Sequence, residues 1–292
     1  MKYSSKSYTL FTIANYIFLA LLSATCIAPL LHLLALSLSS KAPANANLVG
    51  FWPVGFTTAA YYETFGNQNF IRASIISLLR SVVGPVFSMI VTTMGAYSLS
   101  KEHAQFKSRN VYMWFFVFAM LFNGGLIPTY MVVRSIGLMN SFWVLILPIA
   151  VSVFNMILLL NFFRASVPKS VEEAAFIDGA NHIRTLFFIY LPLAVPALAT
   201  ITLFNIIIHW NSYFDGLIYM TDSKNHPLAT FLLTIVVSEN ANPLGMVNNI
   251  KNISESTLKA SQIFLSLIPI LLVYPFLQRY FIKGIIMGSV KE

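Results

Sequence analysis

Charged residues and cysteines are scarce in this chain of 292 residues. Only 10% of the residues are charged and 57% are hydrophobic, whereas a soluble domain carries about 25% charged residues. Such a chain cannot hide its hydrophobic residues in one water-soluble core, so the composition indicates a protein that crosses a membrane several times. The single cysteine, Cys26, excludes an internal disulfide, and no group of Cys and His has the spacing of metal ligands.

Three further signatures are missing from the sequence. The phosphate-binding motif G-x-x-x-x-G-K-[ST] does not occur, so the chain is not expected to hydrolyse ATP itself. The formal charge is +8, but the basic residues form no patch with interleaved aromatic residues, so no nucleic-acid partner is expected. Lys2 and Lys6 give a basic start, yet the apolar run at about 16–38 is too long for a signal peptide and lacks a clear cleavage site. We expect it to be a retained first span.

Six apolar segments are long enough to cross a membrane as helices. A crossing helix needs about 20 apolar residues, and backbone groups in lipid must find partners within the segment itself. The predicted fold class is therefore an all-α, multi-pass membrane protein, with a single domain over residues 1–292. The spans are expected at about 13–38, 74–99, 111–133, 141–163, 186–209 and 262–283.

The positions of lysine and arginine predict the orientation. Basic residues are dense at the N-terminus, in the loops after the second and fourth spans and in the tail, and are thinly spread over the two long loops 39–73 and 212–261. Because cytoplasmic loops carry an excess of Lys and Arg, both termini and the loop 164–185 are expected in the cytoplasm. Within the second long loop, the apolar stretch Leu228–Val237 is too short to span, and we expect a short helix along the outer face.

Glycine and proline are expected to interrupt three of the spans. These breakers are Gly124, Gly125 and Pro128 in the third span, Pro192 and Pro196 in the fifth, and Pro269 and Pro275 in the sixth. Kinks in membrane helices are tolerated where neighbours satisfy the freed carbonyls. Two interpretations stay open, irregular packing and hinges around a central cavity.

The loop 164–185 is polar and mixed in charge, between two apolar runs. Ser170 and Glu173 have capping-box spacing, so a helix is expected to start at Val171. Gly179 can adopt positive φ and end that helix, and Asn181 can cap the next one. Together these residues predict a helix–turn–helix elbow. Taken alone, the capping-box spacing favours a Glu173 that merely caps its own helix, and only the full pattern of the loop favours a contact with another protein.

The same loop resembles a motif of ABC-importer permeases. Glu173-Ala174-Ala175, Gly179 four residues on, and Ile189-Tyr190-Leu191-Pro192 after nine more match E-A-A-x-x-x-G-x(9)-I-x-L-P. In that family, a short coupling helix in this loop sits in a groove of a separate ATPase subunit. The resemblance implies a coupling contact, with the last two residues at its rim, made by Glu172, Glu173, Ala174, Ala175, Gly179, Asp178 and Arg184.

Other segments are similar to permeases of carbohydrate importers. They are 122–130, 209–215 and 274–291, and they most resemble the maltose-permease-like class, in the branch named after lipoprotein-linked and complex-polysaccharide importers. That family implies a type I permease with six helices in the bacterial plasma (inner) membrane. It also implies four kinds of partner: a second, similar permease subunit, two ATPase subunits that bind ATP and Mg²⁺, an extracytoplasmic solute-binding protein and a carbohydrate substrate. No cofactor is expected on this chain.

Polar residues inside the spans are candidates for a substrate path. Asn205 and His209 share one face of the fifth span, and an oligosaccharide needs hydrogen bonds and flat aromatic faces. Helix–helix contact or interface anchoring is the alternative. Arg80 either lines a cavity and meets an acidic sugar such as a uronate, or marks a span that starts later, and Asp215 is expected at the outer interface. The candidate path is Arg80, Asn123, Asn205, His209, Trp210, Asn211 and Tyr213.

The leading hypothesis is the transmembrane subunit of an ATP-driven, binding-protein-dependent importer of an oligosaccharide. An ABC permease for peptides or amino acids is the nearest alternative. An intramembrane enzyme would need a catalytic or metal-binding constellation, which the sequence lacks. An ion-coupled transporter would favour carboxylates within the spans, and none occurs there.

Overall fold

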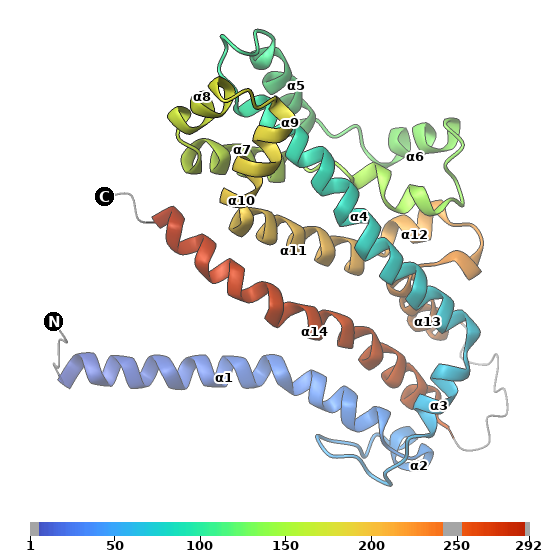
Figure 1. Cartoon of the computed structure of the whole chain (residues 1–292). Coiled ribbons are helices and arrows are strands. Elements are labelled where there is room, and N and C mark those ends of the chain that lie inside the picture. Colours follow the sequence, from blue (N-terminus) through green and yellow to red (C-terminus); the bar gives the residue numbers. More distant parts are fainter. Residues whose placement is uncertain (1–5, 242–252, 290–292) are drawn as a thin grey trace. The chain divides into compact units, whose positions relative to one another are not determined.

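The computed structural model describes residues 6–241 and 253–289, and every regular element in that part of the chain is a helix (Figure 1). The all-α prediction is therefore confirmed. The α-helices are α1 (Lys6–Ser37), α2 (Lys41–Asn45), α3 (Ala59–Gly66), α4 (Gln68–Ser100), α5 (Arg109–Leu121), α6 (Leu126–Ser135), α7 (Val153–Ser166), α8 (Lys169–Ile177), α9 (His182–Thr185), α10 (Leu191–Leu193), α11 (Val195–Asn211), α12 (Phe214–Tyr219), α13 (Leu228–Ala241) and α14 (Glu255–Ser289). Short 3₁₀ turns occur at Phe142–Leu145, Leu147–Ile149 and Ser223–Asn225, and a π-helical turn at Leu186–Tyr190.

Among the described residues, three helices are long and apolar enough to cross a membrane without a break. They are α1, α4 and the Glu255–Pro275 part of α14. Three more stretches qualify only as bent pairs: α5 with α6 at 115°, Phe142–Ile149 with α7 at 54°, and His182–Leu193 with α11 at 84°. Counting each pair as one span gives six, and each predicted segment falls on one of these helices or pairs.

The breaks follow from local chemistry, and two of the three predicted interruptions are confirmed. Gly125 precedes α6 with φ +87° and ψ 176°, a conformation that is essentially restricted to glycine. Ala194 separates α10 from α11, between Pro192 and Pro196, whose rings remove backbone donors. The sixth-span prediction is wrong, because α14 continues through Pro269 and Pro275.

The bend in the fourth span was not predicted. Pro148 lies in the 3₁₀ turn before the bend, and the Ser152 side chain caps α7 by accepting a hydrogen bond from the Asn155 N–H at 3.3 Å. The short helix predicted at Leu228–Val237 is confirmed as part of α13. Residues 242–252 of that long loop, and the end of the tail motif from Val290, lie outside the described residues.

The chain divides into two compact units. The first comprises Met1–Ile71 and Thr234–Pro269, and the second Arg72–Leu233 and Ile270–Glu292. Within the first unit, the hydroxyls of Thr64 and Ser261 are 2.7 Å apart. All the candidate functional residues belong to the second unit. The single-domain assignment stays a prediction.

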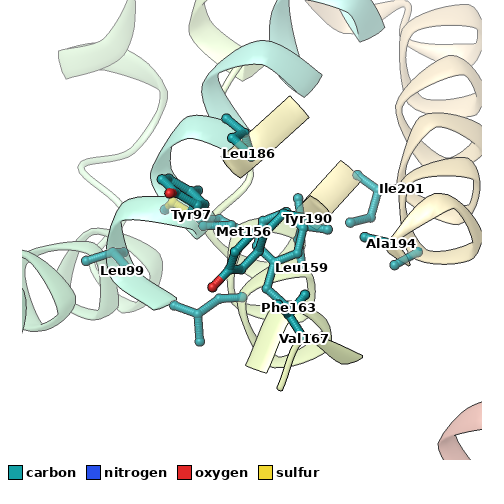
Figure 2. Packing of buried hydrophobic residues seen from close by; sticks show 13 residues of the cluster. Tyr97, Leu99, Met156, Leu159, Phe163, Val167, Leu186, Tyr190, Ala194 and Ile201 are labelled. Atoms are coloured by element: carbon teal, nitrogen blue, oxygen red, sulfur yellow. The ribbon is translucent and has the colours of Figure 1, made fainter. Parts of the chain in front are cut away.

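The core of the second unit lies where the end of α4, the inner face of α7 and the start of the fifth span meet (Figure 2). The α7 residues recur at intervals of three and four, which places them on one helical face. This core therefore holds together the elements on either side of the loop 164–185. Its buried members are Ala96, Tyr97, Leu99, Met156, Leu159, Leu160, Phe163, Val167, Leu186, Tyr190, Ala194, Ala197 and Ile201.

Candidate functional site

The loop 164–185 forms the predicted elbow, made of α8, a tight turn and α9. At the end of α8, the Gly179 N–H donates to the Phe176 carbonyl at 3.1 Å and the Ala180 N–H to the Ala175 carbonyl at 2.9 Å. These two bonds define a Schellman motif, and Gly179 has φ +81°. Asn181 then caps α9 by accepting from the Arg184 N–H at 2.8 Å. The predicted roles of Gly179 and Asn181 are confirmed.

The predicted capping box is wrong. The helix begins at Lys169, with Pro168 at the N-cap and no side-chain cap bond. The extended backbone of Pro168, at φ −62° and ψ 140°, sets the start of α8. Ser170 therefore lies inside the first turn and cannot take the N-cap position. Glu173 therefore does not cap its own helix.

A positive φ at Gly179 gives a testable effect on stability. We expect Gly179→Ala to destabilise the protein by about 1 kcal/mol, because a Cβ is disfavoured in the left-handed region, although no atom lies within 4 Å of it. Gly179→Asn should cost less, since asparagine tolerates this region. Thermal unfolding in detergent measures both. Gly66→Ala, also at an open position but without positive φ, is the control, and an equal loss there would contradict the conformational explanation.

Most of the predicted coupling residues lie on the surface of the elbow. Glu173, Ala174, Asp178, Gly179 and Arg184 are exposed, and Ala175 is half-buried. Sequence reasoning missed two large apolar side chains on the same surface, Ile177 at 86% exposure and Ile183 at 68%. The available signal was the presence of two isoleucines in a loop that also carries many charged and polar residues.

Glu172 differs from its neighbour because it is buried, at 9% exposure. Its Oε1 lies 2.6 Å from the Lys101 Nζ, and its Oε2 accepts from the Tyr190 hydroxyl at 2.6 Å. Burial lowers the pKa of Lys101, and the hydrogen bond and charge of Glu172 offset this only in part. From the sequence, Glu172 was predicted to contact another protein. That prediction is corrected here, because Glu172 is buried against Lys101 and Tyr190 of its own chain.

A polar cavity of about 340 Å³ opens beside this group. Both Glu172 and Glu173 border it, together with Lys101, Arg109 and Arg164. The Arg109 Nε and the Arg164 Nη2 both donate to the Leu99 carbonyl, at 3.0 and 2.9 Å. These two arginines thus satisfy a carbonyl at the end of α4, where a helix leaves its last carbonyls without partners.

A second polar group joins α4 to the start of α12. Arg80 is fully buried and forms an ion pair with Asp215. The Arg80 Nη1 also donates to the Ser212 carbonyl at 3.2 Å, and Asp215 Oδ1 accepts from the Ser212 hydroxyl at 3.0 Å. Neither interpretation of Arg80 from sequence included this partner. Asp215, expected at the outer interface, turns its carboxylate to Arg80.

Two of the candidate path residues in α11 are buried between helices. His209 is 1% exposed, and a Cβ added to Gly84 of α4 would lie 2.5 Å from its Nε2. The Nδ1 of His209 has no hydrogen-bond partner among the described residues. Asn205 is 4% exposed, with its Nδ2 3.9 Å from the Met89 sulfur. In this conformation the packing matches the helix–helix alternative.

The remaining path candidates differ in their exposure. Trp210 is buried, whereas Asn211 and Tyr213 are exposed. Asn123 is exposed in the break between α5 and α6, where its Oδ1 accepts from the Gly125 N–H at 2.9 Å. The structure thus pairs Arg80 with Asp215, and the substrate path stays a prediction.

Comparisons with known proteins agree with this architecture, although no family model matches the chain. It is 38% identical over 288 residues to the polygalacturonan/rhamnogalacturonan transport system permease protein YtcP of Bacillus subtilis, covering 97% of this chain and 98% of that protein. A chain of a bacterial ABC transporter involved in import of the acidic polysaccharide alginate is 32% identical, with a TM-score of 0.88 over 96% of this chain and 100% of that one.

A second solved chain shares the fold at lower identity. It belongs to the bacterial alginate ABC transporter in complex with an alginate pentasaccharide-bound periplasmic protein, and it is 15% identical with a TM-score of 0.54, covering 90% of this chain and 93% of that one. YtcP and the first alginate-importer chain are both more than 30% identical to this chain over nearly its whole length. By this likeness, and by its broken apolar helices and elbow, the chain belongs to the family of ABC transporter permeases and is a membrane transport subunit rather than an enzyme.

Proposed function

We propose that this chain is the transmembrane subunit of a binding-protein-dependent ABC importer for oligosaccharides, with acidic oligosaccharides as the preferred class. The proposal on charge is supported by two relatives, one named for polygalacturonan and rhamnogalacturonan and one for alginate. Polygalacturonan and alginate consist of uronates, which carry a carboxylate on each sugar. Arg80 does not add to this support, because Asp215 already pairs with it.

The partners proposed are those of the family. A second, similar permease subunit completes the pathway, two ATPase subunits bind ATP with Mg²⁺ and hydrolyse it at the cytoplasmic side, and an extracytoplasmic binding protein delivers the sugar. We place the chain in the bacterial plasma (inner) membrane with both termini in the cytoplasm, and the basic residues of the short loops support this orientation. The relative crystallised with a periplasmic protein supports the delivery partner.

The observation that carries the proposal is the surface of the elbow. It presents a carboxylate at Glu173, slim alanines, and two exposed isoleucines, Ile177 and Ile183. Large apolar side chains exposed among charged ones are typical of a protein–protein interface. The ATPases close on ATP and push the elbow, and the helices then switch between inward-open and outward-open arrangements. ATP and the loaded binding protein must each favour the outward state to drive this switch.

The test is reconstitution of the whole complex in lipid. ATP hydrolysis is measured with and without a sugar-loaded binding protein, for the wild type and for Glu173→Ala. We expect the loaded binding protein to stimulate the wild type, and the stimulation to fall about tenfold or more in the variant, because a charged interface contact is lost. Glu63→Ala, which removes an exposed carboxylate from α3, is the matched control.

Two results would overturn the proposal. The first is a wild-type chain that purifies without any ATPase subunit, and the second is a Glu173→Ala complex that is stimulated as strongly as the wild type. The acidic preference is tested by loading the binding protein with oligogalacturonate or with a neutral oligosaccharide of the same length. Equal stimulation by both sugars would overturn the proposed preference for acidic oligosaccharides but not the proposal of an oligosaccharide importer.

A further inference from the structure

Two adjacent glutamates in α8 face different surroundings. Successive residues of an α-helix point about 100° apart, and here Glu173 lies at the surface while Glu172 is buried. Of the nine residues of α8, all of them described, Glu172 is the only buried one. None of the residues in the neighbouring apolar core, as far as the structure describes it, comes from α8. Glu172 is therefore the main attachment of α8 to the membrane helices.

The attachment is a group of four side chains, Tyr97, Lys101, Glu172 and Tyr190, which we name the Lys101 box. The Lys101 Nζ lies 3.8 Å from the ring centroid of Tyr97 and 4.4 Å from that of Tyr190. It also donates to Glu172 at 2.6 Å and to the Tyr190 hydroxyl at 3.2 Å. The two rings meet edge to face, with centroids 4.9 Å apart. Three elements meet here: the end of α4, α8, and the π-helical turn that begins the fifth span.

The box resists opening because its two charged side chains are largely buried, at 5% and 11% exposure. Separating Lys101 from Glu172 would leave two buried charges without partners, which costs far more than breaking an exposed pair. The cation–π contacts add to this cost. A second ion pair joins the same segments, Lys169 of α8 with Glu102 just after α4. Its side chains are 75% and 58% exposed, so water weakens it.

We propose that the Lys101 box makes α8 move as one rigid body with the end of α4 and the start of the fifth span, so that Glu173 receives the ATPase while Glu172 passes the displacement inward. This inference rests on the proposed function, because it assumes that the elbow is the ATPase contact. Lys101 is a positioning residue: it does not touch the ATPase and acts through Glu172.

The first experiment measures coupling in the reconstituted complex. Lys101→Met removes the charge and keeps the chain length, and the exposed surface with Glu173 is unchanged. We expect the variant to retain the ATPase subunits and basal hydrolysis, while sugar transported per ATP falls about tenfold. Lys101→Arg should retain at least about half of the wild-type sugar transported per ATP, since arginine keeps the charge and the cation–π contact. Lys169→Met, which breaks the exposed pair, should stay within about twofold of the wild type.

The second experiment measures rigidity without reference to hydrolysis. In a Cys26→Ser background, spin labels are placed at Ser98 in the last turns of α4 and at Ser170 in the first turn of α8, both exposed. The distance distribution in the complex should be narrow for the wild type and for Lys169→Met, and broad for Lys101→Met. If Lys101→Met does not accumulate, Lys101→Met/Glu172→Gln, which buries no unpaired charge, replaces it with the same expectations.

The outcomes separate the two proposals. Coupling within about twofold of the wild type, or an equally narrow distance distribution, in an assembled Lys101→Met complex would overturn the role of the box. A Glu173→Ala complex that is stimulated like the wild type would instead overturn the elbow as the ATPase contact. In that case the labels still report whether Lys101 holds α8 to α4.

Discussion

Asp215→Ala is expected to destabilise the protein by about 3–5 kcal/mol, because it leaves the Arg80 guanidinium buried without its carboxylate. Arg80 is 0% exposed, and two of its nitrogens donate to Asp215. The Ser212 carbonyl would remain as an acceptor, but it carries no charge. Asp215 also accepts from the Gly216 N–H at 2.8 Å, so the substitution removes a bond that holds the start of α12. Few single substitutions in this chain should cost more.

Thermal unfolding of the purified chain in lipid nanodiscs measures this loss. Glu102→Ala is the control, because it also removes a carboxylate from an ion pair but at an exposed site, where pairs contribute about 0–1 kcal/mol. The double variant Arg80→Gln/Asp215→Asn buries no charge and should recover at least about half of the loss. An Asp215→Ala protein as stable as the control would mean that Arg80 finds water or another acceptor, and the buried pair would then not explain the site.

The pairing of Arg80 bears on the choice of sugar. An arginine that meets a uronate must offer a charge that its own chain has not neutralised, and Asp215 neutralises Arg80 in this conformation. An acidic preference therefore needs another source of positive charge, in a different conformation of this chain or in the second permease subunit. The preference for acidic sugars stays a proposal that rests on the relatives.

Features set by neighbouring residues were predictable from the sequence. The positive φ of Gly179 and the cap by Asn181 each depend on contacts within a few residues, and the breaks at Gly125 and between Pro192 and Pro196 follow from the residues themselves. The predicted start of α8 at Val171 was wrong. The extended backbone of Pro168 places Pro168 at the N-cap, so the helix begins at Lys169. A capping box is a weaker constraint than a proline.

Contacts between distant helices could not be predicted. Lys101 and Glu172 are 71 positions apart, and Arg80 and Asp215 are 135 positions apart. Which of two adjacent glutamates turns inward depends on how α8 is rotated against α4, and a single sequence carries no measure of that rotation. The motif therefore indicated the elbow correctly but not the opposite surroundings of Glu172 and Glu173.

Gly84→Ala is expected to destabilise the contact between α4 and α11 by about 1–3 kcal/mol, because overpacking of a tight interface forces side chains to shift. A Cβ at this position would lie 2.5–2.7 Å from three atoms of the His209 ring. His209 is 1% exposed, so neighbouring atoms enclose its ring on nearly all sides. Glycine allows membrane helices to approach closely, and Gly84 serves that purpose here.

Gly95→Ala on the same helix is the matched control. Its Cβ would also intrude, at 2.4 Å from the Met156 sulfur, but a thioether on a flexible chain can move aside. We expect a loss below about 1 kcal/mol there, partly offset by the higher helix propensity of alanine. Unfolding of both variants under the same conditions separates rigid from flexible neighbours. Equal losses would show that any side chain in this face of α4 is excluded, whatever it meets.

A double-mutant cycle assigns the loss to the imidazole. His209→Ala removes the ring that a Cβ at position 84 would strike, so Gly84→Ala should cost little when it is added to His209→Ala. The coupling energy between the two substitutions should then be about 1 kcal/mol or more, in the range seen for residues in direct contact. Additive losses would mean that Gly84 is needed for the backbone of α4 itself. In that case the contact with His209 would not be the reason for a glycine at position 84.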